Sequence, residues 1–110
     1  MENTIRVLIA DEDKEFCAML RETFCIDERM EIIGTYGDGN GLAQRILQDA
    51  PDVVLMDLVL PGVDGLTVLH ELNEAEPAKM PVIFVVSSFA SQETTEECNA
   101  LGVSFYLRKP

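Results

Sequence analysis

Five short hydrophobic runs recur along the chain, and they are separated by stretches in which apolar residues return every three or four positions. The runs span residues 5–10, 30–33, 53–56, 82–86 and 104–107. The third and fourth runs are almost unbroken and rich in β-branched residues, which is typical of parallel strands buried on both faces. The second run is less apolar, and we interpret it as an edge strand.

The stretches between the runs have the periodicity of amphipathic helices. We expect helices over residues 14–26, 39–49, 65–75 and 92–101. Asp13 and Asp64 are suitable N-caps for the first and third helices, and Gly102 is a suitable C-cap for the fourth. Alternating strands and helices with short connections predict an α/β fold with a parallel sheet and right-handed crossovers.

The chain reaches residue 110 just after the fifth predicted strand, so a single helix would cover one face of the sheet. Open parallel sheets are normally covered on both faces. We therefore expect residues 1–110 to form one domain that lacks its last helix. We also expect the uncovered apolar face either to receive a helix beyond residue 110 or to contact another chain.

Composition narrows the classes of partner. The chain has 8 basic and 20 acidic residues and a net charge of -12, which argues against binding to nucleic acid or to an anionic membrane. Its apolar runs are too short to span a bilayer, and its start lacks the features of a signal peptide. The three cysteines form no CxxC pair, and we interpret them as reduced thiols. These features predict a cytoplasmic protein.

Acidic residues follow two of the predicted strands. Asp11 and Glu12 come directly after the first strand, and Asp57 comes directly after the third. Ligands of open parallel sheets bind at the carboxyl ends of the strands. Carboxylates that meet there repel one another unless water solvates them or they share a hard cation such as Mg²⁺. A solvated helix cap, as we expect of Asp13, is the first case.

Two other strand ends carry complementary groups. Ser87 ends the fourth run with a hydroxyl, and Lys109 follows the fifth with an ammonium group. A hydroxyl and a cation around a carboxylate suit phosphoryl transfer to Asp57, because catalysis of that reaction is mostly positioning and charge neutralisation.

With these features the sequence resembles the receiver domains of bacterial two-component response regulators. The resemblance is carried by Asp11 and Glu12, the segment 57–65, Ser87, and the closing Lys109-Pro110. It implies a doubly wound five-stranded sheet in the order 2-1-3-4-5. It also implies a phosphorylation switch that receives its phosphoryl group from a phosphohistidine of a sensor histidine kinase or phosphotransfer protein and controls a separate output domain, such as a DNA-binding domain.

The resemblance assigns roles to particular residues. Asp57 would be the nucleophile and phosphoryl carrier, and the Lys109–Pro110 peptide bond would be cis. The ligands of Mg²⁺ would be Glu12, Asp57, the main-chain carbonyl of Val59 and, through water, Asp11.

Further roles concern the phosphorylated state. Ser87 and Lys109 would contact the phosphoryl group, and Tyr106 would be the aromatic switch that follows Ser87. Val59 and Phe89 would flank the path of the hydrolysing water. Because both are apolar, we expect the phosphoryl group to be lost slowly. Self-association would use the uncovered face or the face formed by the fourth helix and fifth strand.

The sequence departs from the common family pattern at two site positions. Glu12 stands where aspartate is more usual, and Ser87 where threonine is more usual. Within the family, residues 30–34 and 89–110 look most similar to the sporulation master regulator of spore-forming bacteria.

Two other functions remain as alternatives. The acidic residues after the first strand resemble the motif of haloacid-dehalogenase-type phosphatases, in which Asp11 would be the nucleophile. A receiver-like interaction module that is never phosphorylated is the second alternative. Locating a phosphorylated aspartate, Asp57 or Asp11, would separate these functions.

Overall fold

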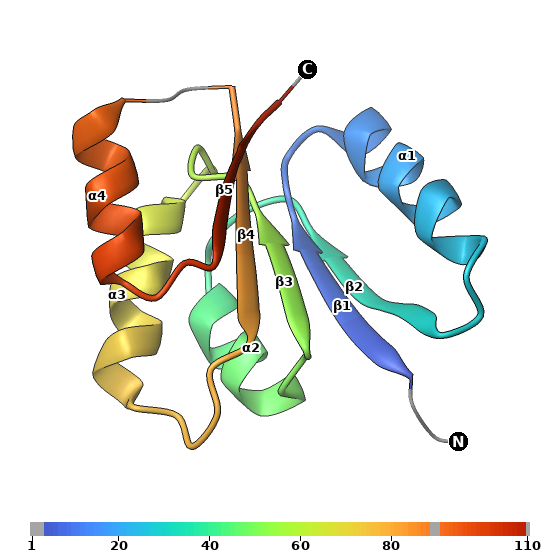
Figure 1. The fold of residues 1–110 in the computed structure, drawn as a ribbon, viewed down its shortest axis with the longest axis horizontal. Helices are drawn as coiled ribbons and strands as arrows, with labels where there is room; N and C mark the ends of the chain where they lie inside the picture. Colours follow the sequence, from blue (N-terminus) through green and yellow to red (C-terminus); the bar gives the residue numbers. More distant parts are fainter. Residues whose placement is uncertain (1–3, 89–90, 110) are drawn as a thin grey trace.

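The computed structural model describes residues 4–88 and 91–109, in which strands and helices alternate as the sequence predicts. The elements are β1 (Ile5–Ala10), α1 (Lys14–Cys25), β2 (Met30–Tyr36), α2 (Leu42–Asp49), β3 (Val53–Met56), α3 (Gly65–Ala75), β4 (Val82–Ser87), α4 (Gln92–Ala100) and β5 (Phe105–Arg108). The strands form one parallel sheet in the order β2-β1-β3-β4-β5 (Figure 1). This confirms the predicted doubly wound fold.

Helices cover the two faces of the sheet unequally. Helices α2, α3 and α4 lie on one face, and α1 lies on the other (Figure 1). The larger core is on the three-helix face and holds the fully buried Leu8, Val54, Leu69, Leu72 and Ile83. Burying a side chain of this size stabilises a fold by roughly 1.5–3 kcal/mol. A smaller core, under α1, consists of Val7, Ile9 and Cys17.

The face that carries only α1 contains a hydrophobic groove of about 480 Å³. The groove runs between α1 and β5 and is lined among others by Phe16, Leu20, Leu55, Phe84 and Leu107. On its β5 side the ring of Phe84 stacks on that of Phe105, which is 52% exposed, with 4.7 Å between ring centroids. The predicted uncovered face is therefore present in this chain.

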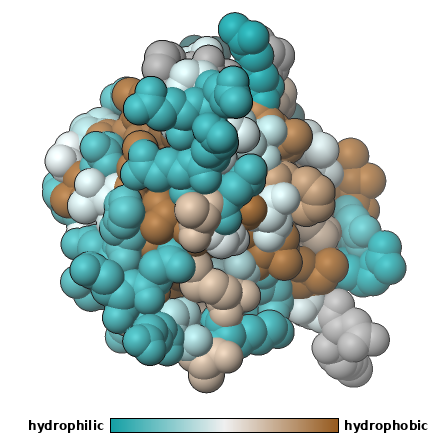
Figure 2. Space-filling view, turned by 60° about the vertical axis from the view of Figure 1, so that its left-hand side comes forward, coloured by the Kyte–Doolittle hydropathy of each residue, from teal (hydrophilic) through white to brown (hydrophobic). Residues whose placement is uncertain are grey.

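The opposite side of the molecule has a different character. Figure 2 shows the side of α3 and α4 with many hydrophilic side chains, while hydrophobic ones lie at the right of the view and in patches between the hydrophilic ones. Among the described helices, none combines the length and the apolar character needed to cross a membrane.

Two element boundaries differ from the prediction by three residues. Helix α2 begins at Leu42 instead of residue 39, because Gly41 has a left-handed φ of 67° and Gly39 is bonded to a neighbouring loop. Strand β2 continues to Tyr36, because it pairs with β1 along the whole length of that strand. The other predicted boundaries lie within one residue of the observed ones.

A β-bulge interrupts the pairing of β2 with β1. The register between β1 and β2 shifts after Val7, so that β2 has one extra residue. Met30 and Ile32 pack against the smaller core, whereas Ile33 and Tyr36 pack against the larger one. The bulge thus changes which face of the sheet the side chains of β2 reach.

Candidate functional site

The carboxyl ends of three strands bring the predicted acidic and basic residues together. The backbone N–H of Asp57 donates to the carbonyl of Ala10, and that of Lys109 to the carbonyl of Ser87, both at 2.9 Å. These bonds extend the sheet by one residue beyond β3 and β5. Asp11 follows β1 in the same way, so all three side chains leave the sheet at one edge.

The ammonium group of Lys109 bridges the two carboxylates. Its Nζ atom lies 2.8 Å from Oδ2 of Asp11 and 3.0 Å from Oδ2 of Asp57. The side chains of Asp11, Asp57 and Lys109 are only 3%, 9% and 15% exposed. Since two carboxylates share a single ammonium, the cluster keeps a net negative charge and can still attract a cation.

The environment favours the charged form of Lys109. Burial by itself would lower the pKa of its ammonium group, but hydrogen bonds and charge interactions with Asp11 and Asp57 outweigh it. The pKa of Lys109 is therefore raised above its usual value. The Nζ atom also lies 4.8 Å from the ring centroid of Phe16, where a cation–π contact adds to the stabilisation.

The loop that follows β3 fixes the carboxylate of Asp57. The N–H of Val59 donates to Oδ1 of Asp57 at 3.0 Å, while the Val59 side chain is 58% exposed. Leu58 and Leu60, on either side of Val59, are both 6% exposed and anchor the loop in the core. One oxygen of Asp57 thus accepts from the loop backbone and the other from Lys109.

Ser87 and Tyr106 lie on the adjacent strands β4 and β5. Ser87 is fully buried at the end of β4, and Tyr106 packs partly buried against the larger core. Burial raises the pKa of the Tyr106 hydroxyl, and a hydrogen bond with the Ser87 side chain acts in the opposite direction. The two predicted switch residues are therefore in contact in this structure.

Of the predicted metal ligands in the described part of the chain, Glu12 lies apart from the cluster. Its side chain is exposed, and with Asp11 it lines a pocket of about 310 Å³ beside the start of α1. Within residues 4–88 and 91–109, no three carboxylate, histidine or cysteine side chains are grouped as a metal site would need. Asp11 and Asp57 are brought together as predicted, and the magnesium site stays a prediction.

Some neighbouring residues have structural roles. Asp13 caps α1 by accepting from the N–H groups of Glu15 and Phe16, which confirms its interpretation as a cap. The thiol of Cys17 donates to the carbonyl of Asp11 at 3.4 Å, and burial raises its pKa. Helical periodicity marks Phe16 only as a core-facing residue, so its contact with Lys109 has no sequence signal.

Two predictions fall on residues that the structure does not describe. Phe89 and Pro110 lie outside the described ranges. The predicted cis Lys109–Pro110 bond and the predicted role of Phe89 beside the hydrolysing water therefore stay predictions.

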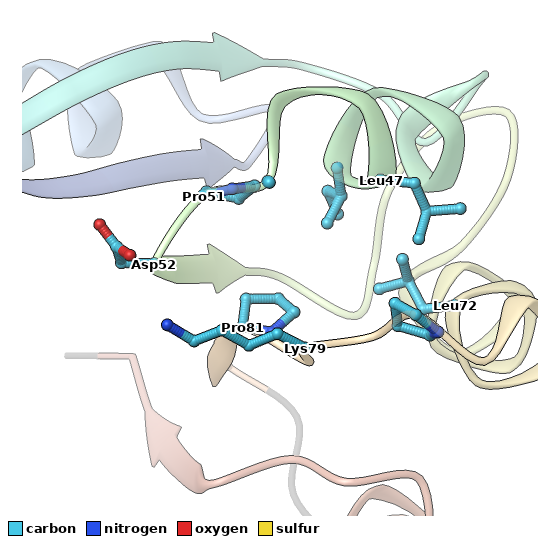
Figure 3. A pocket seen from close by; sticks show the side chains of 9 residues that line it. Leu47, Pro51, Asp52, Leu72, Lys79 and Pro81 are labelled. Atoms are coloured by element: carbon cyan, nitrogen blue, oxygen red, sulfur yellow. The ribbon is translucent and has the colours of Figure 1, made fainter.

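A separate small pocket, of about 90 Å³, lies at the other end of the sheet. Its lining includes Leu47, Pro51, Asp52, Leu72, Lys79 and Pro81, which surround the starts of β3 and β4 (Figure 3). It shares no residue with the acidic cluster, so it is not part of the candidate site.

Comparisons with known proteins agree with this geometry. The family model of the response regulator receiver domain matches residues 7–110. The signal receiver domain of NarL from Mycobacterium tuberculosis is 20% identical, with a TM-score of 0.85 over 97% of this chain and 85% of that chain. The response regulator domain of Thermotoga maritima CheB is 25% identical, with a TM-score of 0.85 over 97% and 79% of the two chains.

A third similar structure is the CheX–CheY–BeF₃–Mg²⁺ complex from Borrelia burgdorferi. It is 25% identical, with a TM-score of 0.85 over 96% of this chain and 78% of that chain. The finer resemblance to sporulation regulators is not confirmed by these comparisons and stays a prediction.

Proposed function

The chain belongs to the family of response regulator receiver domains, which are regulatory phosphoacceptor domains, and we propose that it is a switch phosphorylated on Asp57. The observation that carries the proposal is the position of the Asp57 carboxylate. It is buried at the end of β3, 3.0 Å from the Lys109 ammonium and 3.0 Å from the N–H of Val59. The donor would be a phosphohistidine of a sensor kinase or phosphotransfer protein, and the output would be a DNA-binding domain.

The chemistry follows from these contacts. A carboxylate oxygen of Asp57 forms the new O–P bond while the P–N bond of the donor phosphohistidine breaks, and the electron pair leaves with the imidazole nitrogen. Lys109 holds positive charge beside the oxygens of the transferring phosphoryl group, and Ser87 can donate its hydroxyl to one of them. Such positioning and charge stabilisation provide most of the catalysis of phosphoryl transfer.

Magnesium is part of the proposal. Asp11, Asp57 and Glu12 provide the oxygen ligands that Mg²⁺ prefers, and Asp11 and Asp57 already lie within reach of one ammonium group. The similar complex from Borrelia burgdorferi contains BeF₃ and Mg²⁺. When bound, the ion would neutralise charge on the phosphoryl oxygens.

We expect Glu12→Gln to weaken Mg²⁺ binding about tenfold or more, because it removes the charge of one proposed ligand. Titration calorimetry of the purified chain measures the dissociation constant. Glu15→Gln is the matched control, because Glu15 is also exposed and lies in the first turn of α1. If the two variants bind Mg²⁺ equally well, Glu12 is not a ligand.

The hydrophobic groove is the proposed surface for self-association. We expect the chain to associate as its concentration rises and Leu107→Lys to shift it toward monomer, because Leu107 lines the groove and is 46% exposed. Sedimentation velocity measures the change. Leu47→Lys is the control, since Leu47 is 38% exposed on α2, on the other side of the sheet. A wild type that stays monomeric at every concentration would contradict the proposal.

A further inference from the structure

The turn between β2 and α2 touches the loop that carries the candidate site. The N–H of Gly39 donates to the carbonyl of Pro61 at 3.1 Å, and Gly39 is buried. A Cβ atom built on Gly39 would lie only 1.7 Å from the carbonyl oxygen of Val63 and 2.7 Å from its carbonyl carbon. Even a methyl group at this position would therefore force one of the two backbones to move.

The constraint on Gly39 comes from space and not from backbone conformation. Its φ lies outside the left-handed region, whereas Gly41 in the same turn has a φ of 67°. An added Cβ on Gly37 or Gly41 would meet nothing within 4 Å. Among the three glycines of this turn, only Gly39 lies so close to the neighbouring loop that a side chain would collide with it.

The contacted loop is the one that positions the acceptor. The start of this loop is held by Gly65, the first residue of α3, whose N–H donates to the carbonyl of Leu58 at 2.8 Å. An added Cβ on Gly65 would lie 2.8 Å from the carbonyl oxygen of Asp57. The loop is thus pressed against Gly65 at its start and against Gly39 at Val63, and between them the N–H of Val59 reaches Asp57.

We propose that Gly39 is a positioning residue for the acceptor site, an inference that rests on the proposed function. The close approach of its backbone to Val63 keeps the loop after β3 where the N–H of Val59 meets Oδ1 of Asp57. The same requirement explains a sequence feature that suits a helix poorly. Gly39-Asn40-Gly41 is a weak helix start, but it lets two loops pack backbone against backbone.

The test compares Gly39→Ala with Gly37→Ala, which adds the same methyl group to the same turn in open space. We expect Gly39→Ala to keep its far-UV circular dichroism but to be phosphorylated by acetyl phosphate about tenfold to a hundredfold more slowly. Gly37→Ala should match the wild type. Equal rates for the two variants would overturn the inference.

A second readout does not depend on phosphorylation. In ¹H–¹⁵N spectra, Gly39→Ala should shift the amide resonance of Val59, whereas Gly37→Ala should leave it in place. If the wild type takes up no phosphoryl group but this shift occurs, the proposed function fails and the positioning role of Gly39 stands. If the Val59 resonance is the same in both variants, the positioning role is wrong.

A second pair of variants, Gly62→Ala alone and together with Asn40→Ala, covers the case in which Gly39→Ala does not fold. Gly62 has a left-handed φ of 78°, so an alanine there strains the backbone in both members of the pair, and only the difference between them reports on Asn40. A Cβ on Gly62 would lie 2.5 Å from Oδ1 of Asn40, the end of an exposed side chain that can move. Gly62→Ala should also shift the Val59 amide, and adding Asn40→Ala should reverse part of the shift by removing the obstructing side chain. No reversal in the double variant would show that the two loops are not coupled.

Discussion

Lys109→Met is expected to lower the free energy of unfolding by about 3 kcal/mol or more at neutral pH, the usual size when one partner of a buried ion pair is removed. Asp11 and Asp57, at 3% and 9% side-chain exposure, would then face each other without a cation. Methionine keeps an unbranched side chain of similar length beside Phe16, so the loss of stability comes mainly from the missing charge. Urea denaturation measures it.

The matched control is Lys79→Met, which removes a lysine from an exposed position at the other end of the sheet. Its effect should be small, because isolated surface charges contribute little to stability. If Lys109→Met is no more destabilising than Lys79→Met, the ammonium group does not hold the two carboxylates together.

The difference in unfolding free energy between the wild type and Lys109→Met should depend on pH in one direction. Hydrogen bonds and charge interactions with Asp11 and Asp57 outweigh burial and raise the pKa of Lys109 in the folded state. A group with a raised pKa stabilises the fold fully below its unfolded pKa, which is about 10.4 for lysine. The gap between wild type and Lys109→Met should therefore stay constant from neutral pH up to that value and close as the pH rises through the higher folded pKa.

The part of the site that topology determines was predictable from sequence. Hydrophobic runs place Asp11, Asp57 and Lys109 directly after strands, and parallel strands bring their carboxyl ends to one edge. The cluster at 2.8–3.0 Å follows from these two facts. The strand order could not be predicted from periodicity alone. Its prediction rested on the resemblance to receiver domains.

Contacts between distant backbones were not predictable. The late start of α2 depends on Gly39 meeting the loop at Val63, and hydrophobic periodicity carries no information about such an approach. The bulge in β2 arises from pairing with β1. It turns Tyr36 to the larger core, although Met30 and Ile32, an even number of residues before it, face the smaller one. Glu12 is exposed and takes no part in the ion pairs of Lys109 with Asp11 and Asp57, although it directly follows Asp11 in the sequence.

The alternative functions can be judged partly from the structure. In the phosphatase interpretation the acidic residues after β1 perform the chemistry, yet the Asp13 carboxylate caps α1 and both oxygens of Asp11 contact Lys109. The unphosphorylated interaction module is compatible with all of these contacts. It differs from the proposed function only in whether Asp57 accepts a phosphoryl group.

Asp57→Asn is expected to abolish phosphorylation altogether. The amide has nearly the shape of the carboxylate but lacks the nucleophilic oxygen, so the fold should persist while the reaction stops. Stability should change little, because the loss of the Lys109–Asp57 ion pair is offset by the loss of repulsion between Asp57 and Asp11, and Lys109 keeps Asp11 as a partner. Asp64→Asn is the matched control, since it makes the same change at the end of the same loop, and asparagine serves as well as aspartate at the N-cap of α3.

Intact-mass spectrometry after incubation with Mg²⁺ and acetyl phosphate tests this claim most directly. We predict that the wild type and Asp64→Asn each gain the mass of one phosphoryl group, located by peptide mapping to Asp57, and that Asp57→Asn gains none. A phosphoryl group on Asp57→Asn, or none on the wild type, would contradict the assignment of Asp57 as the acceptor.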